Sequence, residues 1–231
     1  MSTIAAGTTS TTGLVQTSDT TGNLVLQTGA TPTTAMTISS SQIVNFANAP
    51  TIAGNPLPSG AMTLISTLTA SNSASLVWTG LSGYDKYLVI AENLLPVSPS
   101  GSNLITLGYG ATPTYITSGY YFISFTFNYP NGAGAGVFGT ASSETAIYLQ
   151  RYAMTSTTTQ YQATCLINGC SSGINKGYFV DAGWNDLSSP GNELYRKTGT
   201  LVNTNAITAI KVTNDSGNLG TGKASLYGIS S

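Results

Sequence analysis

Apolar and polar residues alternate in short runs along most of the chain, and clusters of Gly, Asn, Ser and Pro separate these runs. A period of two places successive side chains on opposite faces of a β-strand, whereas an amphipathic helix repeats its apolar residues every three or four positions. No window shows convincing helical spacing with a capping residue at its head. The pattern therefore predicts an all-β protein.

Runs rich in β-branched and aromatic residues predict about ten strands after residue 60. They lie at residues 62–70, 74–81, 86–94, 103–110, 120–129, 146–154, 161–169, 177–184, 193–202, 206–214 and 223–230. This number of short strands in about 170 residues is typical of a jelly-roll-like antiparallel β-sandwich. We therefore expect residues 61–231 to form such a domain.

The run YYFISFTFNY shows the clearest alternation. It is typical of a core strand that has one wetter face. The apolar set is Tyr121, Ile123, Phe125, Phe127 and Tyr129, and the other set is Phe122, Ser124, Thr126 and Asn128.

The first 60 residues follow a different pattern, and the Pro and Gly residues of TIAGNPLPSG mark their end. Here GNLVLQTG and AMTISSSQIVNF offer strands too short to bury a core alone. Exposed short strands aggregate unless something covers them, and the simplest cover is the same arm from other subunits or a partner surface. We predict that residues 1–60 form an N-terminal assembly and anchoring arm. Its contacts would be made by Leu24, Leu26, Met36, Ile38, Val44 and Phe46.

The composition supports folding but not binding to polyanions. Apolar residues make up 41% of the chain and charged residues only 6%, with seven basic and eight acidic side chains. Without a basic patch, the chain lacks the main driving force for binding nucleic acid or an anionic membrane. No apolar run approaches the roughly 20 residues of a membrane span, and the N-terminal residues do not resemble a secretory signal. We therefore expect no nucleic-acid partner and no membrane insertion.

The absence of histidine excludes Ser–His–Asp and Cys–His catalysis and histidine-ligated metals. Cys165 and Cys170, in CLINGC, do not make a zinc site by themselves. A disulfide across the NG turn is geometrically conceivable, but without a secretion signal free buried thiols are favoured. We expect no cofactor and no metal.

Paired carboxylates would still permit glycoside hydrolysis. Nothing in their spacing places two of them across one cleft, so we interpret them as solvated or turn-capping groups and the protein as non-enzymatic. The acids considered are Glu92, Glu144, Asp181, Asp186 and Glu193.

The segment GYFVDAGWND is the best candidate for contact with a sugar, because aromatic rings and neighbouring polar groups can stack on and bond to glycans. The candidate contacts are Tyr178, Asp181, Trp184 and Asn185. The competing interpretation places Phe179 and Trp184 in the core, because large aromatic residues more often serve as core residues than as sugar contacts.

Two further segments have simpler interpretations. The glycine-rich YPNGAGAGVFG, residues 129–139, lacks the Lys and Ser/Thr of a phosphate-binding loop, so it predicts a flexible hairpin or loop tip. The basic pair in YRK, residues 195–197, could contact a capsid or a neighbouring subunit. An exposed residue that protects a sheet edge is the favoured interpretation.

Three segments resemble parts of tailed-bacteriophage virion proteins, particularly fibre-type and other surface appendages. TGNLVLQTGATPTTAMTISSSQIVNF resembles a widespread strand–turn–strand segment of those proteins. LSGYDKYLVIAENLLP resembles the opening strand of their β-rich terminal domains, and GNLGTGKASLYGISS resembles the ending of those domains. These motifs are structural repeats and carry no catalytic signature.

The resemblance implies a homotrimeric protein on the virion surface, made in the cytoplasm of the infected bacterial host. Its partners would be its own copies and other virion proteins, either the major capsid protein or tail or portal components. Such proteins serve as tail fibres, head fibres or capsid decoration (cement) proteins. The chain is short and has no shaft repeats or coiled coil, which favours a compact surface knob. The alternative is a receptor-binding tail fibre that recognises a host surface glycan.

Overall fold

A computed structural model describes residues 2–5, 15–17, 23–28, 31, 33–41, 44–46, 51–52, 55–56, 62–97, 101–128, 135–150, 158–171, 173–186 and 191–229. Within these ranges every regular element is a strand, so the expected all-β fold is confirmed. No helix in this part of the chain is long and apolar enough to cross a membrane. The chain divides into two compact units, Met1–Ser59 and Gly60–Ser231.

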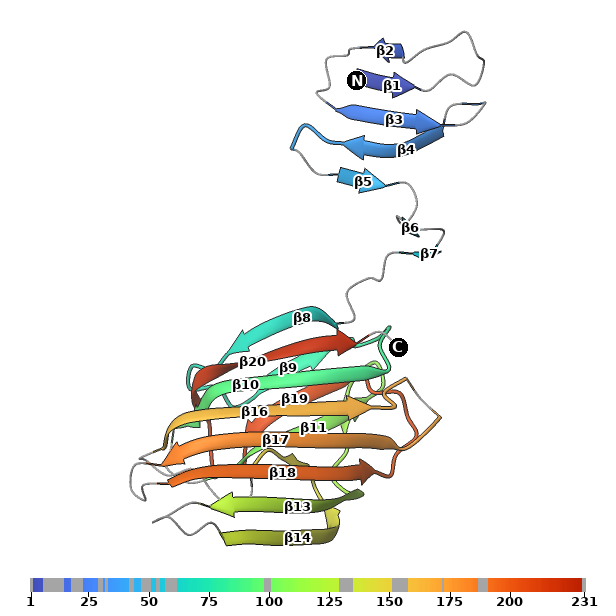
Figure 1. The fold of residues 1–231 in the computed structure, drawn as a ribbon. Helices are drawn as coiled ribbons and strands as arrows, with labels where there is room; N and C mark the ends of the chain where they lie inside the picture. Colours follow the sequence, from blue (N-terminus) through green and yellow to red (C-terminus); the bar gives the residue numbers. More distant parts are fainter. Residues whose placement is uncertain are drawn as a thin grey trace. The chain divides into compact units, whose positions relative to one another are not determined.

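The N-terminal unit contains a five-stranded sheet in the order β2-β1-β3-β4-β5 (Figure 1). Strand β1 runs parallel to β3, and the other neighbours are antiparallel. The strands are β1 (Ser2–Ala5), β2 (Val15–Thr17), β3 (Leu24–Thr28), β4 (Thr33–Ile38) and β5 (Val44–Phe46), followed by the small pair β6 (Thr51–Ile52) and β7 (Asn55–Pro56).

The second unit is an antiparallel, jelly-roll-like β-sandwich of two sheets, as predicted. The larger sheet has eight strands in the order β14-β13-β18-β17-β16-β10-β20-β8, and the smaller has the order β12-β11-β19-β9, with β15 paired to β11. Its strands are β8 (Met62–Thr69), β9 (Leu76–Thr79), β10 (Lys86–Pro96), β11 (Asn103–Tyr109), β12 (Thr114–Tyr115), β13 (Tyr120–Asn128), β14 (Ala135–Glu144), β15 (Ile147–Tyr148), β16 (Thr158–Asn168), β17 (Lys176–Asp186), β18 (Gly191–Leu201), β19 (Ala209–Asn214) and β20 (Leu219–Ile229).

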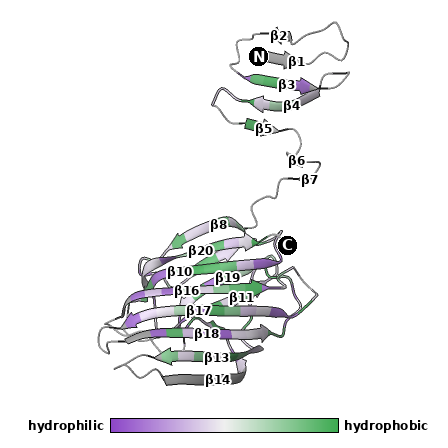
Figure 2. Cartoon of the chain, in the orientation of Figure 1, coloured by the Kyte–Doolittle hydropathy of each residue, from purple (hydrophilic) through white to green (hydrophobic). Residues whose placement is uncertain are grey.

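The core lies between the two sheets, and β10 shows how the sequence builds it. Tyr87, Val89 and Ala91 alternate with Leu88 and Ile90, and the first three are each 1% exposed. Burying one face of a strand fixes which residues turn inward, because successive side chains point in opposite directions. Hydrophobic and hydrophilic positions succeed each other along the strands of the large sheet (Figure 2). Across it, buried residues of β10, β16 and β20 pair in register.

A β-bulge interrupts the pairing of β10 with β20 after Glu92. Asn93 and Gly222 both adopt positive φ angles there, 49° and 96°. A Cβ atom on Gly222 would lie 2.1 Å from the carbonyl oxygen of Asn93, so only glycine fits. The bulge turns Asn93 so that its side-chain oxygen accepts a hydrogen bond from the backbone N–H of Tyr161 at 3.3 Å. Bulges often re-aim side chains beside functional surfaces.

Both cysteines are free and buried. Burial raises the pKa of the Cys165 thiol, and it raises the pKa of Cys170 to about 12, with a smaller contribution from Asp85. Thiols held in the protonated form are poor nucleophiles. The two cysteines therefore serve as core residues, as the sequence favoured.

Strand β13 buries the face that its sequence predicts to be exposed to solvent. Tyr121, Ile123 and Phe127 are 43%, 60% and 43% exposed, whereas Ser124 and Thr126 are 3% and 0% exposed. The expected wetter face is thus the buried one, and the apolar face is open to solvent.

Tyr120 explains this orientation. Its side chain is fully buried, and its hydroxyl donates to the carbonyl oxygen of Ile116 at 3.3 Å and accepts from the N–H of Leu107 at 3.2 Å. With Tyr120 fixed inward, the following odd-numbered positions must turn outward. Tyr129, which was assigned to the same face, lies outside the described residues.

The glycine-rich segment belongs to a hairpin, one of the two alternatives predicted, and is not a loop tip throughout. Ala135–Glu144 forms strand β14 and pairs antiparallel with β13, so the second half of the segment, residues 135–139, is part of a hairpin strand. Residues 129–134 lie outside the described part of the chain. Backbone pairing with β13 compensates for the low strand propensity of glycine here.

Candidate functional site

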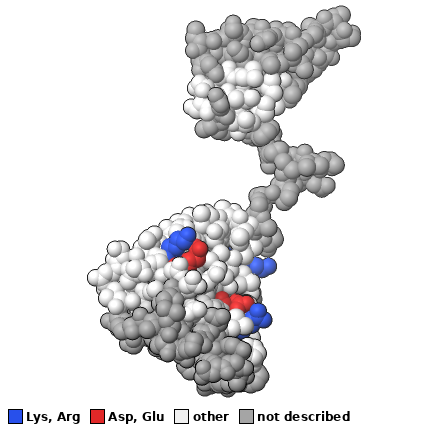
Figure 3. Space-filling view, turned by 60° about the vertical axis from the view of Figure 1, so that its left-hand side comes forward, with Lys and Arg blue, Asp and Glu red and all other residues white. Residues whose placement is uncertain are grey.

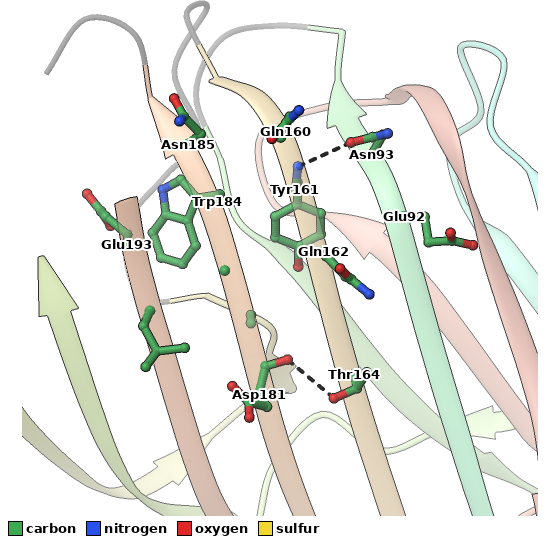
Figure 4. A pocket seen from close by; sticks show the side chains of 13 residues that line it. Glu92, Asn93, Gln160, Tyr161, Gln162, Thr164, Asp181, Trp184, Asn185 and Glu193 are labelled. Atoms are coloured by element: carbon green, nitrogen blue, oxygen red, sulfur yellow. Dashed lines mark hydrogen bonds between the residues drawn. The ribbon is translucent and has the colours of Figure 1, made fainter. Parts of the chain in front are cut away.

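A groove of about 630 Å³ crosses β10, β16, β17 and β18 on the large sheet (Figure 4). Most of its lining side chains are on the outer face of that sheet, the one turned away from the smaller sheet. The lining residues are Glu92, Asn93, Gln160, Tyr161, Gln162, Thr164, Asp181, Ala182, Gly183, Trp184, Asn185, Glu193 and Leu194.

Strand register brings these residues together from distant parts of the sequence. Glu92, Gln162, Gly183 and Leu194 pair in succession across the four strands. Gly183 hollows the middle of this row, because it has no side chain and a Cβ atom there would meet only the carbonyl oxygen of Glu193, at 3.6 Å. The groove therefore owes its depth at this point to one residue.

Two surface ion pairs balance the charge around the groove. Asp181 lies 3.3 Å from Arg196, and Glu92 lies 3.1 Å from Lys223. Figure 3 shows acidic and basic residues side by side in parts of this view, with a further basic group apart from them at its edge. Because the side chains are substantially exposed, each pair contributes at most about 1 kcal/mol to stability. The groove therefore presents polar groups without a strong net charge.

The two aromatic lining residues belong to the core. Tyr161 and Trp184 are 2% and 5% exposed, and the Tyr161 hydroxyl donates to the side-chain oxygen of Gln150 at 3.0 Å. Neither ring offers an open face for stacking. Recognition in this groove would therefore depend on the outward amides of Gln160 and Gln162 and on the carboxylates.

The structure places three of the four predicted glycan contacts at the groove: Asp181, Trp184 and Asn185. Trp184 is buried, as the competing interpretation expected, whereas Phe179 is 44% exposed and not a core residue. The amides of Gln160 and Gln162 were missed. Their alternation with Tyr161 in TQYQAT was the available signal, since period-two spacing turns both glutamines outward.

Tyr178 lies away from the groove. It is 2% exposed, and its hydroxyl donates to the backbone oxygen of Tyr121 at 3.0 Å. Its ring contacts Tyr120 edge-on, with centroids 6.4 Å apart. It is a core residue, not an accessible sugar contact.

The acids are distributed over different environments. Glu92, Asp181 and Glu193 line the groove, while Glu144, the last residue of β14, forms an ion pair with Lys197 of β18. The side chain of Asp186 lies outside the described residues. Within the described ranges, no cluster of three or more His, Cys, Asp or Glu residues could hold a metal ion.

Lys197 corrects the interpretation of the YRK segment. Strand β18 lies between β13 and β17, so it is not a sheet edge, and Lys197 is 1% exposed. Its ammonium forms an ion pair with Glu144 and lies 3.8 Å from the centroid of the Phe122 ring. Burial lowers the pKa of Lys197 and raises that of Glu144, and in each case the attraction of the partner opposes the shift.

The N-terminal sheet brings the predicted assembly residues into two rows. Leu24 pairs with Ile38, which pairs with Val44, and this is the first row. In the second row Leu26 pairs with Met36. Met36 also pairs with Phe46, whose side chain lies outside the described residues. Directly paired residues share one face of a sheet, so the described members form a single apolar face.

This apolar face is only partly covered within one chain. Leu24, Leu26, Met36 and Ile38 are half-buried, and Val44 is 47% exposed. By contrast Val25, on the opposite face, is 4% exposed. The rows therefore leave apolar surface open on one side of the sheet.

No family model and no curated protein matches the chain. Among solved structures, a GH16 protein from the mixed linkage glucan PUL of Bacteroides ovatus, in complex with a product, aligns with 9% identity and a TM-score of 0.22, over 73% of this chain and 86% of that one. The structure of infectious bursal disease virus, Gx strain, aligns with 10% identity and a TM-score of 0.10, over 97% of this chain and 50% of that one. Likenesses this low carry no argument about function, and the fold assignment rests on the sheets themselves.

Proposed function

We propose that the protein is a non-enzymatic structural subunit of a bacteriophage virion. It forms a homotrimeric surface appendage that decorates or stabilises the capsid or makes a short head or tail fibre. The observation that carries this proposal is the half-covered apolar face of the N-terminal sheet, built from Leu24, Leu26, Met36, Ile38 and Val44.

An open apolar face on a small sheet needs a second layer, because a sheet buries its hydrophobic face against another element. Other copies of the same sheet supply that layer without a new partner. Three such sheets with their apolar faces turned toward a common axis cover one another and leave none unpaired. The segment that builds the face is also the segment that resembles phage virion proteins, which supports this role over a linker.

Quantitative mass spectrometry of purified virions tests this proposal. The expected result is that the chain is present at a copy number that is a multiple of three. Hundreds of copies would assign it to the capsid surface, and a few to the tail. Absence of the chain from particles that are complete and infectious would contradict the proposal.

A second function, recognition of a host surface glycan, is favoured by the groove. Apart from Leu194, its outward lining consists of amides, carboxylates and a hydroxyl around the hollow at Gly183, and polar groups of this kind hydrogen-bond sugar hydroxyls. The carboxylates Glu92 and Asp181 are held by Lys223 and Arg196, which suits binding better than proton transfer. Tail or head appendages with such a groove would bring it to the cell surface.

The Gly183→Val substitution tests the glycan function. The valine side chain would fill the middle of the groove without backbone strain, because the nearest atom to its Cβ is 3.6 Å away. We expect retention on a bacterial surface-glycan array to fall at least tenfold. Gly177→Val is the matched control, since Gly177 is an outward residue of β17 that does not line the groove and has similar space, 3.9 Å. Equal retention of both variants, or no retention of the wild type, would reject this function.

A further inference from the structure

The outer face of the large sheet carries a row of apolar side chains, interrupted by one threonine, which we call the apolar stripe. Strand register connects its members one by one, from β13 through β17, β16, β10 and β20 to β8, with Thr198 of β18 between the first two. The stripe consists of Ile123, Phe179, Leu166, Leu88, Tyr227 and Leu64. Figure 1 shows these strands in succession in front of β9, β11 and β19.

The stripe is open to solvent in the single chain. Ile123, Phe179 and Leu64 are 60%, 44% and 51% exposed, and the other three members are half-buried. Tyr121 and Met62 extend it along one side and are 43% and 48% exposed. Scattered exposed apolar residues are normal, whereas a contiguous exposed row marks an interaction surface.

The outer face of the smaller sheet is more polar than the stripe. Its outward positions on β19 and β9 include Lys211, Thr213 and Thr79, and one exposed apolar residue, Val77. Tyr115 lies over this face, with its ring carbons 3.2 Å from the position of a Cβ on Gly108 and its ring 3.9 Å from the Lys211 ammonium. The stripe on the large sheet has no comparable cover among the described residues.

Charge favours another copy of this chain as the partner. On the same outer face, Arg196 pairs with Asp181 in the row next to the stripe, and Lys223 pairs with Glu92 two rows away. The opposite charges of each pair neutralise each other within one copy, so two copies of this face can approach without like-charge repulsion. The face also offers no unbalanced charge that an acidic or basic partner could match.

The dimensions favour a threefold axis over a flat dimer. Six strand spacings of about 4.8 Å give the stripe a length of roughly 29 Å, and one to two same-face residues, spaced about 7 Å along each strand, give it a width of roughly 10 Å. That is on the order of 300 Å² of flat area, well below the roughly 800 Å² per partner of a standard two-subunit interface. Three faces that meet at an axis touch along a line, and a long, narrow apolar strip suits such a contact, as a heptad seam does in a coiled coil.

We infer that the apolar stripes of three copies meet along the threefold axis of the homotrimer, so that each stripe member contacts the same residue of the neighbouring copies. This inference rests on the homotrimer proposed above and adds the surface that holds the sandwiches together. The stripe supplies part of the trimer interface, and the N-terminal sheet supplies the rest.

Single cysteine substitutions in the full-length protein test this geometry. Ile123→Cys and Leu64→Cys, made separately, place a thiol near each end of the stripe. We expect a short bismaleimide to link identical positions in different copies, giving a band at twice the chain mass in denaturing gels. The native cysteines are buried and contribute no background. Val202→Cys is the matched control because Val202 is 57% exposed, lies outside the stripe, and should not cross-link.

The outcomes separate this inference from the proposed function. If the wild type sediments as a trimer but neither stripe variant cross-links more than Val202→Cys, the stripe faces something else, a different virion protein or a membrane, and the inference is wrong. If the wild type sediments as a monomer, the homotrimer itself is wrong. Cross-linking at both ends of the stripe in a trimeric protein is the supporting result.

Discussion

The Glu144→Gln substitution is expected to lower the free energy of unfolding by about 3 kcal/mol, a large share of the stability of an ordinary domain. Within the described part of the chain, it removes the one charge that forms an ion pair with the Lys197 ammonium. The Lys197 side chain is 0% exposed, so it cannot turn toward water. An uncompensated buried charge is among the costliest defects in a protein core.

The Lys197→Met substitution should cost less, about 1 kcal/mol. Methionine fills the space beneath Phe122 and Tyr148 and leaves no buried cation. The remaining carboxyl of Glu144 is 21% exposed, so it can reach water or stay protonated. In the double variant the cost should stay close to that of Lys197→Met alone, because the two residues interact and their effects are not additive.

Urea unfolding followed by tryptophan fluorescence measures these costs at fixed protein concentration. Trp78 and Trp184, the two tryptophans of the chain, are both buried in the sandwich. Lys223→Met is the control, because the Lys223 and Glu92 side chains are 50% and 43% exposed, and its effect should stay within about 0.5 kcal/mol. A larger cost for Lys197→Met than for Glu144→Gln would contradict the assignment.

The Val44→Asp substitution should abolish assembly through the N-terminal sheet. Val44 is 47% exposed in the single chain, so an aspartate there leaves the fold of one copy intact. In a trimer the same carboxylate would be buried against apolar residues of a neighbour, at a cost of about 2 kcal/mol or more for each copy. We expect association to weaken at least thirtyfold, and incorporation into virions to be lost.

Thr34→Asp is the matched control for that experiment. Thr34 is exposed on β4 and pairs with Gln27, so it lies on the face opposite Leu26 and Met36. Virions produced with this variant should carry the normal number of copies. If Val44→Asp is incorporated as well as Thr34→Asp, the apolar rows do not make the assembly contact.

The sequence predicts the strands well because their signal is local. The runs at 62–70 and 86–94 correspond to β8 and β10, and the register of β3 with β4 aligns the predicted apolar pairs of the N-terminal sheet. Apolar–polar alternation is a property of neighbouring residues, so it can be recognised in the sequence without knowledge of the fold.

Which face of a strand is buried is not local, and here prediction failed. In β13 the apolar residues point outward because Tyr120 is anchored inward by bonds to Leu107 and Ile116, on other segments. Lys197 is buried because β14 places Glu144 beside it, and the sequence did not predict that strand β14 continues to Glu144. Long-range pairing decides both cases, and one strand's composition does not reveal it.

The groove was predictable only in part for the same reason. Asp181 and Asn185 both lie on β17, so the sequence of this one segment was enough to predict both as site residues. Glu92 and Gln162 reach the groove only through the strand order β10-β16-β17-β18. The bulge that turns Asn93 toward Tyr161 depends on Gly222, far away in sequence.

The central claim is that other copies of this chain complete its open apolar surfaces, and the mass of the full-length protein in solution tests it most directly. Sedimentation equilibrium at micromolar concentration is predicted to give three times the chain mass of 23.7 kDa. A species of 23.7 kDa that persists as the concentration rises would contradict the claim.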